Sequence, residues 1–274
     1  AMNVEGAAVE RRIGRTIMPR FHAAFSLGTV AGAAMGAAAA ALDVPVVVHL
    51  TTIGVVIVIV AAVATRDFLP RQPDSDDPAE SATASVWRAW SEPRTLAVGL
   101  MVMSFALTEG VANDWLAIAL VDGYDVTNAV GSAGYAVFVT AMTIARTAGT
   151  HVLDRFGRVP VLRVSGALGA AGVLLVVLGG SMPVALAGVV LWGFGAALGF
   201  PLGMSAAADD PARAAARVSV VSSIGYTAFL AGPPILGWLG DHEGVLHALL
   251  VVVIASAVGA MVAPAARERA RDHA

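Results

Sequence analysis

Cysteine and lysine are both absent from the 274-residue sequence, and each absence removes whole classes of chemistry. Without cysteine, the chain has no disulfides, no thiolate metal ligands and no thiol nucleophile. Without lysine, it has neither the amine of a phosphate-binding P-loop nor a Schiff-base amine. We therefore do not expect this chain to supply energy from bound ATP.

Charge of either sign is also scarce. Charged residues make up 14% of the sequence and hydrophobic residues 57%, with a mean hydropathy of +0.76. An average soluble domain has about 25% charged residues. The composition is that of a membrane protein whose surroundings are the lipid bilayer. The net charge of −3 gives no indication of a nucleic-acid partner.

The sequence has long apolar runs in place of this missing charge. A bilayer core about 30 Å thick needs about 20 apolar residues for each helical span. The runs do not alternate between apolar and polar residues as barrel strands do, so only helices can satisfy their backbone in lipid. We predict an all-α bundle with eight spans, at residues 22–42, 44–65, 95–121, 128–150, 161–180, 183–204, 217–239 and 245–264.

The basic residues are all arginine, and all but Arg146 lie at one side of the predicted spans. The loops on the opposite side carry Asp43, Asp122, Asp125, Asp241 and Glu243 without any basic residue. Because cytoplasmic loops carry the excess of arginine, the distribution predicts that both ends of the chain are cytoplasmic.

A polar segment divides the predicted spans into two groups. Residues 66–94 are rich in Pro, Asp, Ser and Ala, as expected of a linker in the cytoplasm. We predict a domain boundary there, with residues 1–65 on one side and the six spans of residues 95–274 on the other.

Two carboxylates lie inside the third predicted span. Glu109 is near its middle, about 20 Å from either end. An ionised carboxylate at that depth costs about 3 kcal/mol or more, so it is expected to face the bundle interior or a water-filled cavity. Glu109 is the best candidate for proton coupling, and a structural acid bonded to neighbouring helices is the alternative. For Asp114, an interfacial anchor is the commoner explanation, and a functional role is the alternative.

Other polar and aromatic residues inside the spans complete this candidate site. Arg146 is a candidate counter-charge for Glu109 or a substrate anchor, unless its long side chain extends to the cytoplasmic interface. Asn113 is a further substrate candidate. The candidate cavity-lining residues are Tyr135, Trp192 and Tyr226.

No metal or cofactor site is predicted. His242, Glu243 and His247 resemble a zinc-protease signature, but the two histidines are five residues apart. On a helix this spacing turns them about 140° away from each other. An enzyme inside the membrane would need a catalytic dyad or metal cluster at helix depth, so we do not expect enzymatic activity.

The fourth span ends in Asp154-Arg155-Phe156-Gly157-Arg158, in which Gly157 can adopt a positive φ. In this position the segment resembles a gating-loop motif of the major facilitator superfamily, Gly-Asp-…-Asp-Arg-x-Gly-Arg. Gly149, Asp154, Arg155, Gly157 and Arg158 match the motif. Thr150-His151 stands where the family often has an Asp-Arg pair, so the head of the motif departs from the pattern.

Residues 2–28, 108–115 and 199–210 are also similar to a bacterial branch of this superfamily that includes exporters and sugar-permease relatives. The resemblance implies that the chain holds the family's helices five to twelve and the tail of helix four, and that its N-terminal helices are missing. It also implies a location in the bacterial inner membrane.

The sequence therefore favours a secondary active transporter of small organic solutes. Proton coupling through Glu109 and alternating access between two helical halves are expected, with protons, a small-molecule substrate and the missing N-terminal helices as partners. The alternative is a truncated membrane scaffold that transports nothing.

Overall fold

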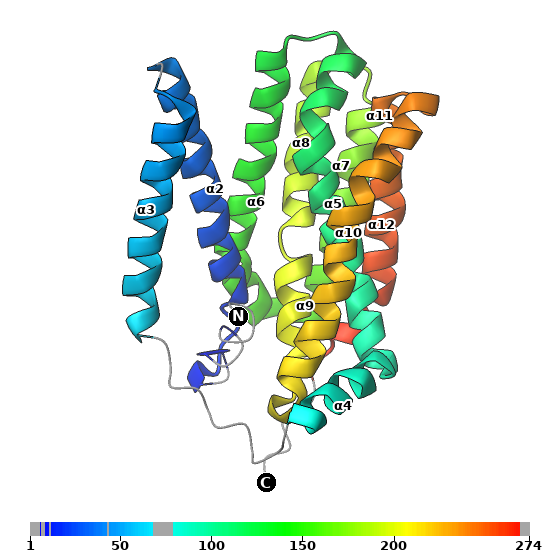
Figure 1. Ribbon diagram of the computed structural model, residues 1–274. Helices are drawn as coiled ribbons and strands as arrows, with labels where there is room; N and C mark the ends of the chain where they lie inside the picture. The colour runs from blue at the N-terminus through cyan, green and yellow to red at the C-terminus, as the bar shows by residue number, and fades with distance from the viewer. Residues whose placement is uncertain (1–5, 7–8, 11, 43, 68–78, 269–274) are drawn as a thin grey trace.

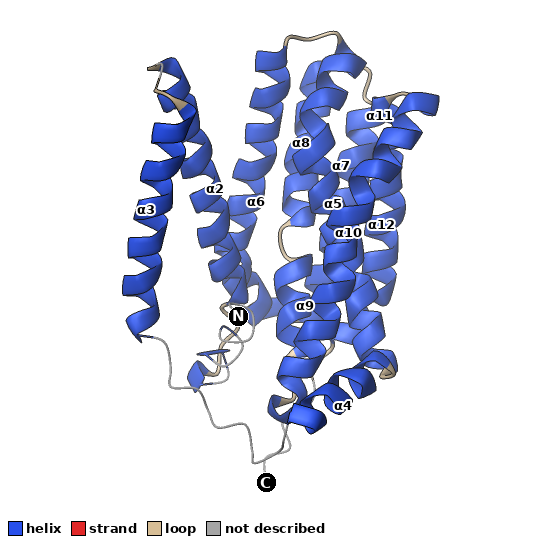
Figure 2. Ribbon diagram, viewed as in Figure 1, coloured by secondary structure: helices blue, strands red, loops and turns tan. Residues whose placement is uncertain are grey.

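The protein is an all-α bundle. The computed structural model describes residue 6, residues 9–10, 12–42, 44–67 and 79–268. Within these ranges the regular structure is helical, with no strand, as Figure 2 shows. The elements are α2 (Met18–Ala41), α3 (Val46–Ala64), η1 (Thr65–Asp67), α4 (Ala79–Trp90), α5 (Pro93–Tyr124), α6 (Asn128–Phe156), α7 (Arg158–Leu178), α8 (Met182–Ala196), α9 (Gly199–Ala207), η2 (Pro211–Arg213), α10 (Ala214–Glu243), α11 (Val245–Ala248), α12 (Leu250–Val262) and η3 (Ala263–Ala266).

Seven helical stretches of the described chain are long and apolar enough to cross a membrane. They begin at residues 46, 93, 128, 158, 182, 211 and 245, and each corresponds to one of the predicted spans. The remaining prediction, residues 22–42, coincides with the 24-residue helix α2. The predicted helix-four tail at residues 1–10 lies mostly outside the described residues.

Three details differ from the predicted boundaries. Helices α6 and α7 are separated by Gly157 alone, whose φ of +74° turns the chain where a longer loop was expected. The predicted span 183–204 is interrupted between α8 and α9. The linker 66–94 contains helix α4, in which Ala89 packs on Ala216 and Val220 of α10.

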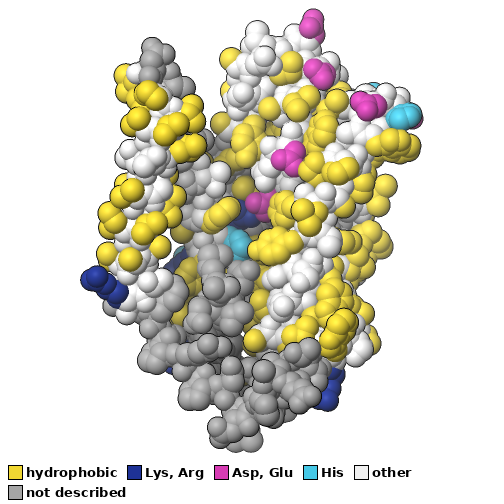
Figure 3. All heavy atoms as spheres, in the orientation of Figure 1, with side chains coloured by type: hydrophobic (Ala, Val, Ile, Leu, Met, Phe, Trp, Pro, Cys, Tyr) yellow, Lys and Arg dark blue, Asp and Glu magenta, His cyan; other side chains and the backbone are white. Residues whose placement is uncertain are grey.

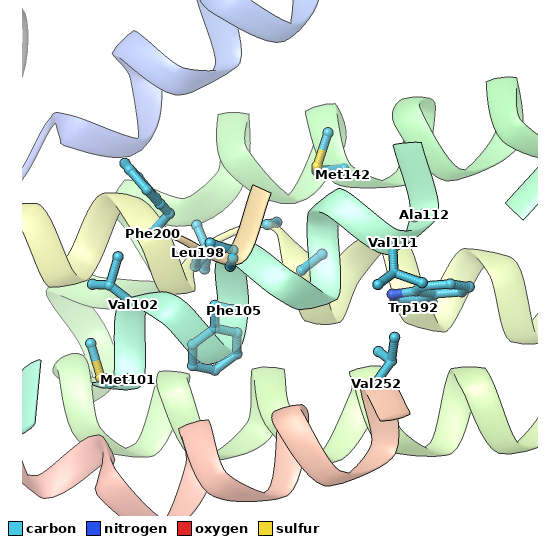
Figure 4. Packing of buried hydrophobic residues seen from close by; sticks show 14 of the residues in the cluster. Met101, Val102, Phe105, Val111, Ala112, Met142, Trp192, Leu198, Phe200 and Val252 are labelled. Carbon is cyan, nitrogen blue, oxygen red and sulfur yellow. The ribbon is translucent and has the colours of Figure 1, made fainter. Parts of the chain in front are cut away.

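Helix α5 is at the centre of the packing, in contact with α6, α9, α10 and α12. The buried core follows it, and Phe105 packs against Gly199 and Gly259 of neighbouring helices. Figure 4 shows the aromatic side chains of Phe105 and Trp192 within this core. Rigid packing of this kind holds the turn that carries Glu109 in one position.

Helices α7 and α8 approach each other through glycine. A Cβ added at Gly188 would lie 2.5 Å from the carbonyl oxygen of Gly172. Small residues permit such close contact between helices in lipid, where the hydrophobic effect does not hold helices together.

Helices α2 and α3 stand at the side of the bundle. In Figure 1, α2 approaches α6 at the lower end, and the two helices separate toward the upper end. Helix α2 contacts α6 and α9, whereas α3 has no buried residue. The junction between α2 and the C-terminal helices is therefore formed mainly in the lower half.

Candidate functional site

A buried ion pair joins helices α5 and α6. Arg146 Nη2 donates to Glu109 Oε2 at 2.7 Å, and the two side chains are 2% and 13% exposed. The side chain of Arg146 therefore remains in the interior and does not extend to the cytoplasmic interface. A buried pair of this kind is costly to break, because either partner alone would be an uncompensated charge in a medium of low dielectric constant.

The remaining donors of Arg146 reach two further segments. Its Nε donates to the carbonyl oxygen of Ala197 at 3.0 Å, and its Nη1 donates to Ser26 Oγ at 2.6 Å. In a continuous helix the amide of residue 201 would bond Ala197, but that residue is proline and has no N–H. Arg146 thus satisfies the carbonyl exposed by the break between α8 and α9, and it ties that break to α2 and α5.

His22 lies one turn before Ser26 on α2. Its ring is buried against Phe200, with the ring centroids 5.5 Å apart, and it is close enough to Arg146 for the two to interact electrostatically. His22 Nε2 is buried and has no hydrogen-bond partner in the described part of the protein. Such orphaned atoms are rare in folded proteins and mark places where water or a ligand can bind.

A polar face continues from Glu109 along α5. Asn113 Oδ1 accepts a hydrogen bond from the hydroxyl of Tyr135 at 3.2 Å, and Tyr135 also interacts electrostatically with both Glu109 and Asp114. Asn113 and Asp114 are exposed, and Tyr226 on α10 is 52% exposed. Among the residues that the structure describes, no three His, Asp or Glu side chains gather as metal ligands do.

Trp192 corrects the predicted cavity lining. Its side chain is completely buried in the core, and its Nε1–H donates to the carbonyl oxygen of Thr108 at 3.0 Å. Polarity within a span was a poor guide here, because an indole N–H can be satisfied inside the bundle. Trp192 reaches the site through the backbone of Thr108, the residue before Glu109.

The gating-loop motif occupies the lower end of α6. Gly149 packs against Leu198 and Pro19, so α2 comes close to α6 there. Asp154 pairs with Arg15 at 3.1 Å, but both side chains are about half exposed and the pair contributes little stability. The Arg155 guanidinium lies 5.4 Å from the ring centroid of Phe156.

Arg158 belongs to a polar network that the sequence did not reveal. Its guanidinium donates to Asp209 Oδ1 at 2.7 Å and to Ser205 Oγ at 2.9 Å. Ser205 in turn donates to Glu10 Oε2 at 2.7 Å, across 195 residues of sequence. Glu10 Oε1 accepts from the backbone amides at the start of α2, where an anion is stabilised by the helix dipole.

A second ionic cluster lies beside this network at the start of α5. Glu92 accepts hydrogen bonds from Arg217 at 2.6 Å and from Arg213 at 3.0 Å. The hydrogen bond from Arg217 is the main cause of a lowered pKa of the Glu92 carboxyl, which burial partly opposes. Glu92 therefore stays charged well below neutral pH and holds the ends of α5 and α10 together.

Comparison with known proteins agrees with this architecture. The sequence profile of the Major Facilitator Superfamily matches residues 16–227 and, in a second alignment, residues 98–273. The uncharacterized transporter y4wD of Sinorhizobium fredii is 32% identical over 269 residues, which cover 98% of this chain and 70% of that protein. An uncharacterized MFS-type transporter of Yersinia pestis is 30% identical over 267 residues, which cover 94% of this chain and 67% of that protein.

Solved structures share the fold at lower identity. The crystal structure of the fucose:proton symporter FucP of E. coli has a TM-score of 0.67 and 17% identity, and covers 81% of this chain. This chain spans 55% of the length of that structure. The same transporter in an outward conformation gives the same TM-score. With the profile covering most of the sequence and two relatives aligned over nearly its whole length, the chain belongs to the Major Facilitator Superfamily.

Proposed function

We propose that the protein is a secondary active transporter of small organic solutes, coupled to protons and working by alternating access between two helical halves. The observation that carries the proposal is the Glu109–Arg146 pair, buried in the middle of α5 where α2 meets the C-terminal helices. Charged side chains are costly at this depth of a membrane, and those that occur there usually mark a functional site.

Proton binding to Glu109 would change the contacts that join the two halves. A protonated Glu109 no longer compensates the charge of Arg146, whose guanidinium also holds Ser26 on α2 and the carbonyl of Ala197. The uncompensated guanidinium of Arg146 is then more stable if it moves toward another acceptor. This movement would shift α2 relative to α5 and α9, which is the kind of change that alternating access requires.

The network at the arginine-rich end serves as the closed gate in this proposal. Glu10 and Ser205 form a hydrogen bond between the N-terminal segment and α9, and Arg158 supports Ser205 from α7. The gate opens when these contacts separate. We assign residues 1–65 to one half, residues 66–94 to a cytoplasmic loop and residues 95–274 to the other half, with both ends of the chain on the cytoplasmic side of the inner membrane.

The N-terminal half contributes two long helices here, α2 and α3, whereas six membrane spans follow the linker. Nearly half of the FucP chain lies outside the part that this chain matches. We propose that helices equivalent to this additional length complete the cavity opposite Glu109. They are partners of the site rather than part of the described chain.

The test measures solute-driven proton movement in proteoliposomes that hold the whole gene product. A pH-sensitive dye inside the vesicles reports protons as neutral sugars (L-fucose among them), amines and carboxylates are added in turn. We expect one class of solute to move protons, and we expect Glu109→Gln to abolish this movement. The control Asp241→Asn, near the end of α10 that is opposite to the arginine-rich end of the protein, should leave it intact. Unchanged proton movement in Glu109→Gln would remove this carboxylate from the mechanism, and no movement with any class would favour a membrane scaffold.

A further inference from the structure

The charge of the solute can be argued from the donors and acceptors that the site leaves free. Each of the three nitrogens of the Arg146 guanidinium already donates one hydrogen bond, to Glu109, Ser26 and Ala197, and because the side chain is 2% exposed its two remaining N–H groups are enclosed by protein. An anionic solute would have to displace Glu109 from a buried pair before it could bind Arg146. The arrangement therefore disfavours an anion as the solute.

Acceptors, in contrast, remain available. Glu109 Oε1 has no hydrogen-bond partner among the described residues, and its side chain is partly exposed on the face that carries Asn113 and Asp114. On the α2 side, the buried Nε2 of His22 also has no partner. A carboxylate oxygen accepts hydrogen bonds, and His22 Nε2 also accepts in the tautomer whose hydrogen is on Nδ1. The unfilled positions therefore call for a ligand that donates.

Aromatic rings lie beside these acceptors. A Cβ added at Gly110, next to Glu109, would meet the ring of Phe229 at 3.0 Å, so that ring packs directly on this turn of α5. The ring of Tyr226 is 6.4 Å from that of Phe229 and 5.9 Å from that of Phe200, centroid to centroid. Carboxylates together with aromatic faces are the usual surroundings of an ammonium group, through ion pairing and cation–π contact.

The face of the molecule around Glu109 carries mostly negative charge. In Figure 3, acidic side chains lie from the middle of the molecule to its upper end, whereas arginine side chains lie at the lower margin and beside the acid in the middle. The described acids at the upper end are Asp122, Asp125, Asp241 and Glu243. A face lined by one sign of charge raises the local concentration of ions of the opposite sign.

Building on the transport function proposed above, we infer that the solute is a small organic cation whose protonated amine binds Glu109. The amine donates to the free carboxylate oxygen and to the opposite acceptors, and the rings of Tyr226 and Phe229 contact its apolar part. The cation and the proton compete for Glu109. The other titratable or charged groups around this carboxylate are Arg146 and Tyr135 on α6, Asp114 on α5 and His22 on α2.

The experiment compares three probes that share a phenyl ring and a short chain and differ in charge. They are 2-phenylethylammonium, 2-phenylethanol and 3-phenylpropanoate. Binding of the radiolabelled amine to the protein in lipid nanodiscs is measured at equilibrium without any gradient, and the other two probes compete with it. We expect saturable binding of the amine, at least tenfold weaker competition by the alcohol and the acid, and weaker amine binding at lower pH.

Variants then locate the site. Glu109→Gln and Tyr226→Leu should each weaken binding of the amine about tenfold. Tyr226→Phe, which keeps the ring, and the control Arg163→Gln, at an exposed position of α7, should change it less than threefold. Equal or stronger competition by the acid or the alcohol, absence of saturable amine binding, or full binding in both Glu109→Gln and Tyr226→Leu would overturn the inference. Selective amine binding without proton movement would refute the proposed coupling alone, and proton movement driven by a sugar or an acid would refute the cation alone.

Discussion

Replacing Arg146 by methionine leaves the carboxylate of Glu109 buried without its counter-charge. The substitution removes the guanidinium 2.7 Å from Glu109 Oε2 and also the donors to Ser26 and Ala197, and it keeps most of the side-chain volume. A buried charge that loses its partner destabilises a protein by about 3–5 kcal/mol. The carbonyl of Ala197, which then has no donor, adds to this cost.

The two single variants should therefore differ in cost. Arg146→Met should lower the free energy of unfolding by about 5 kcal/mol or more, because it loses both the counter-charge and the donor to Ala197. Glu109→Gln leaves the guanidinium without its counter-charge but keeps its hydrogen bonds to Ser26 and Ala197, so it should cost about 3–5 kcal/mol. The double variant has neither charge, and we expect it to recover about 2 kcal/mol relative to the sum of the single changes.

The assay is equilibrium unfolding of the purified protein in detergent micelles, followed by tryptophan fluorescence, with these variants compared at pH 7. Arg155→Met, an exposed arginine on the same helix, is the matched control and should change stability by less than about 0.5 kcal/mol. If the costs of Arg146→Met and Glu109→Gln were additive in the double variant, Glu109 would not depend on Arg146 for its charge.

Three further predictions use the same unfolding assay. Gly172→Ala should destabilise by about 2 kcal/mol or more, because its Cβ would collide with the backbone of α8, whereas the control Gly54→Ala faces open space and should be neutral or slightly stabilising. Trp192→Phe should lower the free energy of unfolding by about 1 kcal/mol, because the hydrogen bond to α5 is lost, and Trp192→Ala should lower it by about 3–5 kcal/mol. Equal losses in the two variants would show that the volume of the ring does not matter there. Because Arg217 lowers its pKa, Glu92 should stabilise the protein above about pH 4.5, and this contribution should disappear as pH falls toward the lowered pKa. Glu92→Gln should flatten the acid side of the plot of unfolding free energy against pH. Above pH 6 the plots of the variant and of the unchanged protein should be parallel.

Much of the fold could be predicted from the sequence, because a bilayer requires long apolar helices and the predicted spans contain very few charged residues. The seven spans that the structure shows follow directly from that requirement. The pairing of Glu109 with Arg146 was one of three readings of the sequence, since a separation of 37 positions fixes neither the distance nor the direction of the side chains. Packing between α5 and α6 decides it.

The contacts between distant segments could not be predicted. Glu10 and Ser205 are 195 residues apart, and the family resemblance of the two segments that contain them gave no indication that they meet. Whether a polar side chain faces a cavity or the core is equally hidden, as Trp192 shows. Both depend on how the helices rotate about their axes, and in spans of uniformly apolar sequence no amphipathic pattern sets that rotation.

The helix break at Ala197 did leave a signal in the sequence, and it explains why Arg146 is placed where it is. Pro201 deprives the carbonyl of Ala197 of its helical donor, and a carbonyl without a partner inside a membrane costs several kcal/mol. Arg146 Nε supplies that donor, so the arginine is required for the helix as well as for the charge of Glu109. A guanidinium can serve both because its donors point in several directions in one plane, which a lysine ammonium does not offer at this distance. The helix break and the ion pair therefore depend on one side chain. Any event that draws Arg146 away from Glu109 also loosens the junction between α8 and α9. Because Ser205, near the C-terminal end of α9, binds Glu10, such a change reaches the N-terminal segment as well.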